Sequence, residues 1–130
     1  MEAKHKHLEF IQGVINRLAT DSFRMKGWAV VLVSALLVLL AREERGGFVC
    51  IGFVPVLVFW GLDGYFLWQE RLFRDLYDHV RTLDGADVDF SMNIGAFKRT
   101  WLGATFSRTL VPFHLALALA VGLAMLIKLN

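Results

Sequence analysis

The chain has 130 residues, of which 56% are hydrophobic, and its formal net charge is +2. Soluble domains usually contain about 45–50% apolar residues, and here the excess is concentrated in three blocks. This composition argues against a disordered chain, a fibrous protein and an ordinary soluble enzyme. The single cysteine, Cys50, excludes an intrachain disulfide and a zinc site made of cysteines.

An amphipathic helix is predicted over residues 4–22. Apolar side chains recur there at spacings of three and four residues, at Leu8, Ile11, Ile15 and Leu18. The pair Asp21-Ser22 is a candidate break before the first apolar block. The helix can pack on protein or lie on lipid, and packing is favoured. His5 and His7, near the start of this helix, are expected to be solvated, and no metal site is predicted.

Three apolar blocks predict three membrane spans, at residues 23–41, 46–69 and 110–128. A cleaved signal peptide is the rival interpretation of the first block, but the 26 residues before its uncharged run Gly27–Ala41 and the charged Arg42–Arg45 segment after it disfavour that reading. Lys and Arg number five before the uncharged run Gly27–Ala41 of the first block, two between the first and second blocks, six between the second and third, and one after the uncharged run Leu110–Ile127 of the third. By the positive-inside rule, the N-terminus and residues 70–109 are cytosolic and the C-terminus is periplasmic. The predicted fold is therefore all-α: one helical integral membrane domain, residues 1–130, in the bacterial inner membrane.

The second span is expected to continue into the cytosol as one helix from Asp63 to Leu83. Its apolar positions follow a heptad, which normally needs a partner helix. The partner is either the 4–22 helix or another subunit. Small residues in the third span also allow close helix approach. Homo-oligomerisation, with a tetramer as the preferred number, is predicted through Leu62, Phe66, Phe73, Leu76, Val80, Ala116, Ala120 and Ala124.

No catalytic motif of the nucleotide-binding, metalloprotease or serine-hydrolase kind is present, so no enzyme activity is predicted. Asp63 interrupts the second apolar block. Carboxylates inside membranes are costly and usually face a bundle interior or water. Asp63 is therefore either a pore-lining or gating acid, or an interfacial residue in water. His114, near the start of the third block, fits an interfacial position.

Cations and aromatic side chains are mixed in the 70–109 segment. Arginine binds phosphate and aromatic rings stack on bases, so these residues can bind a nucleotide. From the residues alone, positive-inside charge and interfacial aromatics explain the mixture better. The candidate ligand-binding set is Arg71, Arg74, Tyr77, Arg81, Lys98, Arg99 and Trp101.

Four segments carry a family resemblance: HLEFIQGVINRL at 7–18, SFRMKGW at 22–28, FWGLDGYFLWQERLFRDLYDHVR at 59–81 and DFSM at 89–92. They resemble small bacterial membrane proteins encoded beside TIR-domain proteins in anti-phage defence loci of the Thoeris kind. The chain is also broadly similar to SLATT-like two-transmembrane effectors, from which the third predicted span departs.

The resemblance implies a membrane effector of anti-phage immunity. A TIR-domain protein would be its functional partner and an NAD-derived signalling nucleotide its activating ligand. The effector would assemble or open and permeabilise the inner membrane. The alternatives are a membrane anchor or scaffold for a soluble partner, and a small ion channel or transporter. No nucleic-acid partner is expected.

Overall fold

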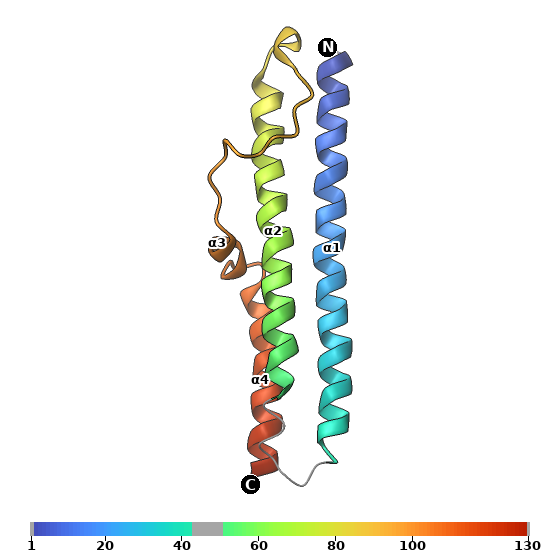
Figure 1. Ribbon diagram of the computed structural model, residues 1–130, viewed down its shortest axis with the longest axis vertical. Coiled ribbons are helices and arrows are strands. Elements are labelled where there is room, and N and C mark those ends of the chain that lie inside the picture. Colours follow the sequence, from blue (N-terminus) through green and yellow to red (C-terminus); the bar gives the residue numbers. More distant parts are fainter. Residues whose placement is uncertain (1, 43–50, 130) are drawn as a thin grey trace.

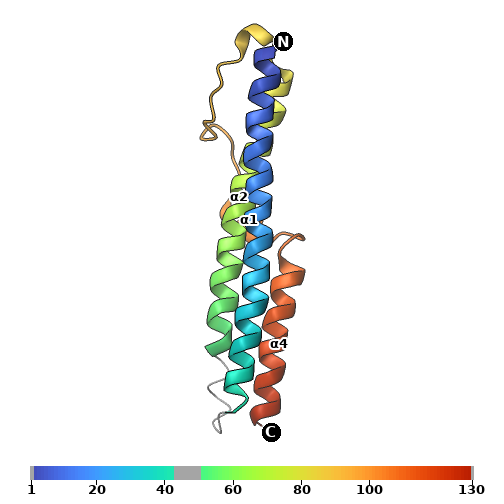
Figure 2. The same cartoon turned by 90° about the vertical axis from the view of Figure 1, so that its right-hand side faces the viewer.

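The computed structural model describes residues 2–42 and 51–129, and this part of the chain is helical with connecting loops and no strand. Two long helices, α1 (Glu2–Leu40) and α2 (Phe53–Thr82), run antiparallel along the whole molecule. The short helices η2 (Gly85–Asp87) and α3 (Trp101–Thr105) follow, and α4 (Val111–Leu129) lies beside the lower halves of α1 and α2. The N- and C-termini are at opposite ends (Figures 1 and 2). The predicted all-α fold is confirmed.

The predicted break between the amphipathic helix and the first span is wrong, because α1 is one helix from Glu2 to Leu40. Neither Asp21 nor Ser22 ends a helix as proline or glycine would. Instead, Ser22 occupies a buried position on the face of α1 that also buries Ile15 and Ala29. The helical periodicity of the buried face therefore passes through the two polar residues.

The upper halves of α1 and α2 pack through a small apolar core. Ile11 and Ile15 of α1 are buried against Leu76 and Val80 of α2, with Phe73 packed at the edge. This contact fills the upper part of the predicted heptad seam from within the chain, as the packing interpretation of residues 4–22 expected. Leu62, in contrast, is 42% exposed. In the lower half of α2 the heptad positions no longer face α1, because a straight α-helix drifts relative to a seven-residue repeat.

The lower half of the molecule is a three-helix contact. Val33 of α1, Val56 of α2 and Val121 of α4 form its buried core, and Ala124 packs against it. The other two alanines of the predicted α4 interface, Ala116 and Ala120, are exposed. Their predicted role in subunit contact is therefore compatible with the surface they occupy and stays a prediction.

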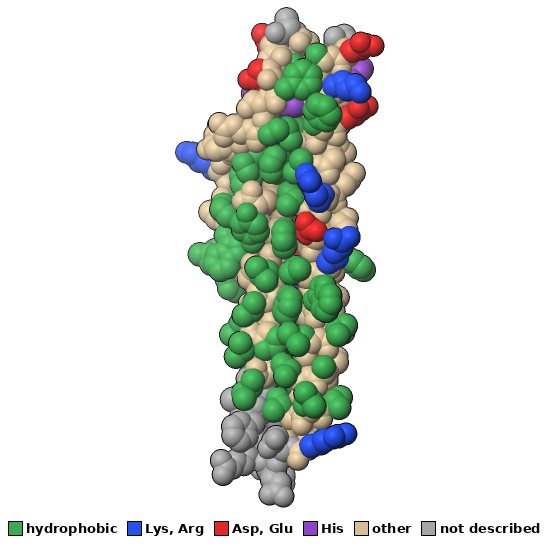
Figure 3. All heavy atoms as spheres, turned by 45° about the vertical axis from the view of Figure 1, so that its right-hand side comes forward, with side chains coloured by type: hydrophobic (Ala, Val, Ile, Leu, Met, Phe, Trp, Pro, Cys, Tyr) green, Lys and Arg blue, Asp and Glu red, His purple; other side chains and the backbone are tan. Residues whose placement is uncertain are grey.

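Within residues 2–42 and 51–129, two helices, α1 and α4, are long and apolar enough to cross a membrane. Only 11% of the most apolar window of each is buried inside the molecule, so these windows are not core helices of a soluble bundle. Figure 3 shows hydrophobic side chains covering the lower half of one face, while most charged side chains lie in the upper half. An exposed apolar surface of this extent marks contact with lipid or with other protein.

The described part of α2 does not meet the same test for a membrane span. Asp63 interrupts its apolar stretch, and the charged residues from Glu70 onward end it. The predicted second span begins at Gly46, and residues 46–50 lie outside the described residues. With about 1.5 Å of rise per residue, the 30-residue α2 is about 45 Å long. A hydrocarbon core is about 30 Å thick, so α2 is long enough to leave a membrane by several turns.

Candidate functional site

Asp63 is the centre of a buried polar cluster at the level where α4 begins beside α1 and α2. Its side chain is 0% exposed, although most carboxylates in proteins are solvated. The neighbouring buried positions on α2 are Gly64 and Leu67. A carboxylate in such a place is stable only with charged or hydrogen-bonding partners.

Three side chains from two other helices supply these partners. Ser22 of α1 donates its hydroxyl to Asp63 Oδ1, and Lys26 Nζ lies 2.7 Å from Oδ2. His114 of α4 donates Nε2–H to the same Oδ2 across 2.7 Å, because a carboxylate can only accept. Lys26 Nζ also donates to Ser22 Oγ across 3.0 Å. These four residues, here called the Asp63 cluster, connect all three long helices.

Aromatic packing holds His114 in place. The ring of Trp60 stacks on the His114 ring with centroids 5.7 Å apart and an interplanar angle of 8°. Trp60 Nε1 donates to the backbone carbonyl of Thr105 across 2.7 Å, which ties α3 to the same place. His114 Nδ1 is buried with no hydrogen-bond partner among the described residues. Both carboxylate oxygens of Asp63 therefore have partners, whereas the second nitrogen of the His114 ring has none within the described residues.

Gly64 lets α3 approach α2 directly beside Asp63. A methyl group at this position would overlap the hydroxyl of Thr105 and lie 3.1 Å from its Cα. Thr105 Oγ1 donates to the backbone carbonyl of Trp101 across 2.8 Å, and Trp101 Nε1 donates to the carbonyl of Gly61 across 3.0 Å. The α3 segment therefore covers the outside of α2 at the height of the Asp63 cluster.

Three of the five predicted ligand-binding cations, Arg74, Arg81 and Arg99, contact carboxylates of the chain. Arg99 makes a two-pronged contact with Asp75, with Nε and Nη2 2.8 and 2.9 Å from the two oxygens. Arg74 lies 3.6 Å from Glu70, and Arg81 lies 3.6 Å from Asp78. Of the remaining predicted residues, Arg71 is half-buried, Lys98 is exposed, Tyr77 packs against the upper core, and Trp101 lies on Gly61. The structure brings these residues into no single cluster within the described part of the chain.

The contact between Arg99 and Asp75 fixes the loop that precedes α3. The hydrogen bonds from Arg99 lower the pKa of the Asp75 carboxyl below its ordinary value of 3.8, against a smaller opposing effect of burial. Trp68 Nε1 also donates to the carbonyl of Arg99 across 2.9 Å. The basic segment at 97–101 is therefore held along α2 by one ion pair and by the indole hydrogen bonds of Trp68 and Trp101.

Sequence reasoning identified Asp63 and missed its partners. His114 was expected to be interfacial. The helical spacing of α1 could have indicated these partners. Ser22 stands four residues after Leu18 and Lys26 four residues after Ser22, so both polar residues occupy positions where an apolar residue would continue the buried face. Polar residues at inward positions of three different helices form a candidate network.

The comparisons with known proteins give no relative for this chain: no family model, no curated protein and no solved structure matches it. None of them links the chain to Thoeris-associated or SLATT-like effectors. The functional argument therefore rests on the chain's own residues and on their arrangement.

Proposed function

We propose that the chain is a three-span inner-membrane effector whose cytosolic helices control the opening of its membrane part. The observation that carries this proposal is the Asp63 cluster, which connects the three long helices where the apolar half of the molecule meets the charged half. A buried polar network of this kind is costly unless fully paired, and it therefore favours one register of the helices over others.

The lower half of α2 is the second of the three spans in this proposal. It packs against both α1 and α4, which among the described residues are the two helices long and apolar enough to cross a membrane. Termini at opposite ends of the molecule fit an odd number of spans. The distribution of Lys and Arg supports a cytosolic N-terminus and a periplasmic C-terminus.

The continuity of α2 supplies the mechanical connection. One helix carries both Val80 of the upper core and Val56 of the lower core, with Asp63 between them. A tilt or rotation of the upper part reaches the lower part as a rigid movement. It would separate Asp63 from Lys26 or His114 and admit water between the helices. To shift the ratio of open to closed molecules from 1:99 to 99:1, a ligand must bind the open state more tightly by about 5.5 kcal/mol.

The resemblance described above supplies the biological context. In that context a TIR-domain protein makes an NAD-derived nucleotide, which binds the cytosolic cations Arg71, Arg74 and Arg81. A homo-oligomer, with a tetramer as our preferred number, then permeabilises the membrane and stops the infected cell. The chain itself performs no catalysis in this scheme.

Dye release from liposomes that contain the purified chain tests this function. The expected result is release on addition of the nucleotide products of a TIR enzyme, and loss of that release in the variant Arg71→Ala/Arg74→Ala. Arg17→Ala, which removes an exposed cation from α1, should release dye like the wild type. Products that neither bind nor cause release would contradict the proposal.

Two alternatives make different predictions in the same assay. A small ion channel or transporter, favoured by the buried Asp63–His114 pair, would conduct ions without any added nucleotide. A membrane anchor or scaffold would release nothing and would retain a soluble partner through the exposed surface of its cytosolic helices.

A further inference from the structure

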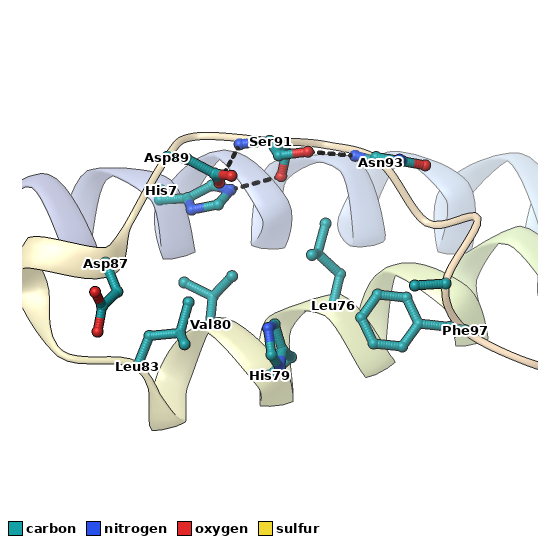
Figure 4. A pocket seen from close by; sticks show the side chains of 11 residues that line it. His7, Leu76, His79, Val80, Leu83, Asp87, Asp89, Ser91, Asn93 and Phe97 are labelled. Atoms are coloured by element: carbon teal, nitrogen blue, oxygen red, sulfur yellow. Dashed lines mark hydrogen bonds between the residues drawn. The ribbon is translucent and has the colours of Figure 1, made fainter.

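A pocket of about 310 Å³ lies at the end of the molecule farthest from the C-terminus. Its floor is apolar and comes from α2, through Leu76 and Val80, with Phe97 at one side. Residues 87–96 pass over it, and His7 of α1 closes its far wall (Figure 4). Ligand sites commonly measure about 300–1,000 Å³, so this pocket fits a small ligand or one part of a larger one.

His7 is the unusual member of the pocket. It was expected to be solvated, but its side chain is 1% exposed. Its Nε2 donates to the backbone carbonyl of Ser91 across 2.9 Å, and its ring lies 5.4 Å from the ring of Phe90. Phe90 has a φ of 58°, a left-handed conformation that few non-glycine residues adopt. The loop is therefore held over His7 at a conformational cost.

The second ring nitrogen of His7 has no partner. Nδ1 is buried without a hydrogen bond among the described residues, and Figure 4 shows it on the side of the ring that faces the pocket. A carbonyl oxygen only accepts, so Nε2 carries a proton. In the neutral imidazole, Nδ1 is therefore a buried acceptor. An unpaired buried acceptor is destabilising, and a ligand that donates to it would remove that cost.

The charge of the pocket sets the class of ligand. Two carboxylates, Asp87 and Asp89, line it, and its lining residues include no Lys or Arg. This is the opposite of a phosphate site. We infer that the pocket binds a small ligand with an N–H donor on a flat apolar body and no negative charge at the end that enters. The donor would meet His7 Nδ1, the body would cover Leu76 and Val80, and the carboxylates would favour positive charge or further donors.

Two sources of this chemistry can be told apart: an aromatic amine, and the aminopurine of a nucleoside. The site is separate from the cations Arg71, Arg74 and Arg81 of the proposed function, and its occupation does not depend on that function. If the proposed function holds, the nucleoside end of a nucleotide would enter this pocket.

The experiment is a titration of the full chain in detergent micelles with tryptamine, adenosine and inorganic phosphate, followed through the ¹⁵N signals of the histidine rings. Tryptamine or adenosine should shift the Nδ1 signal of His7 and saturate, while phosphate should leave it unchanged. Saturation by tryptamine identifies an amine site, and saturation by adenosine a nucleoside site. Asp87→Asn should weaken tryptamine binding at least about fivefold, because it removes one of the two carboxylates. Asp84→Asn, an exposed acid outside the pocket lining, should bind like the wild type.

His7→Gln supplies the second variant. Glutamine keeps an N–H donor for the Ser91 carbonyl, but its own acceptor is an amide oxygen on a flexible side chain in place of the fixed ring Nδ1. Binding should therefore fall at least about tenfold while the loop stays in place. Its unfolding transition shows whether the fold is retained, and Asp87→Asn carries the test if it is not. The inference is overturned if phosphate shifts His7 as strongly as the two donors do, or if neither donor shifts it at millimolar concentration.

Discussion

Lys26 and Asp63 form an ion pair of 2.7 Å between α1 and α2, with the carboxylate fully buried and the Lys26 side chain 21% exposed. The lysine thus connects a buried acid to the surface of the bundle. Removal of one partner from a buried ion pair leaves an uncompensated charge, which costs much more than removal of both. This asymmetry gives the first test of the cluster.

Asp63→Asn should lower the free energy of unfolding in detergent by about 3 kcal/mol, because Lys26 then loses its charged partner in a buried setting. Lys26→Met should also destabilise, since Asp63 keeps its charge with only Ser22 and His114 to compensate. The double variant should be less destabilised than the sum of the two, by about 1–3 kcal/mol. Strictly additive losses would show that the pair is not coupled.

A matched pair of glycine variants tests the contact between α2 and α3. Gly64→Ala should destabilise by about 1–3 kcal/mol, because the new methyl group meets Thr105. Gly13→Ala has no atom within 4 Å of the new methyl group. It should stabilise α1 by up to about 1 kcal/mol through helix propensity. Thermal unfolding followed by circular dichroism shows whether each variant is destabilised or stabilised. A Gly64→Ala variant as stable as the wild type would contradict the close approach of α3.

The ion pair between Arg99 and Asp75 should depend on pH in a defined direction. Its effect is to lower the pKa of Asp75 in the folded chain below the ordinary value of 3.8. The stabilisation is therefore present above about pH 4 and lost as the pH falls through the folded pKa. Arg99→Gln should cost about 0.5–1 kcal/mol at pH 6, a value reduced for the exposure of Arg99.

The difference in free energy of unfolding between the wild type and Arg99→Gln should disappear near pH 2. Arg81→Gln is the control, because Arg81 and Asp78 are both 64% exposed and 3.6 Å apart. It should change stability little at any pH. A loss at Arg99→Gln that stays constant down to pH 2 would assign the effect to packing of the side chain instead of its charge.

Two leucines of α2 separate contacts within the chain from contacts between subunits. Leu76 is buried against Ile11 and Ile15, so Leu76→Ala should cost about 2–4 kcal/mol of stability and leave the oligomer mass unchanged. Leu62 is exposed in the single chain, so Leu62→Asp should reduce the mass measured by light scattering in mild detergent. A wild-type chain that is monomeric under all conditions would contradict the proposed oligomer.

The helical fold was predictable because apolar blocks and heptad spacing are local signals. The upper core illustrates this, since the period of Ile11 and Ile15 matches that of Leu76 and Val80. The start of the second span at Gly46 stays a prediction, because residues 46–50 lie outside the described residues. The described helix of that span, α2, begins at Phe53.

The candidate site was only partly predictable, because it depends on which polar residues three distant helices bring together. Asp63 stands out in an apolar block by itself. Ser22 and His114 do not, since a polar residue near the end of an apolar stretch is ordinary at a membrane interface. Their burial follows from the continuity of α1 and the position of α4, which are tertiary features. His7 was misjudged for the same reason, because the loop that covers it lies far away in the sequence.

Leakage from liposomes with variants of the Asp63 cluster tests the central claim most directly, because it needs no knowledge of the ligand. If the cluster holds the membrane helices closed, Asp63→Asn should release dye without any signal, at least about tenfold faster than the wild type. Asp78→Asn, which neutralises an exposed acid on the same helix, should remain as tight as the wild type. Equal and negligible leakage from all three proteins, each shown to be folded and inserted, would contradict the account.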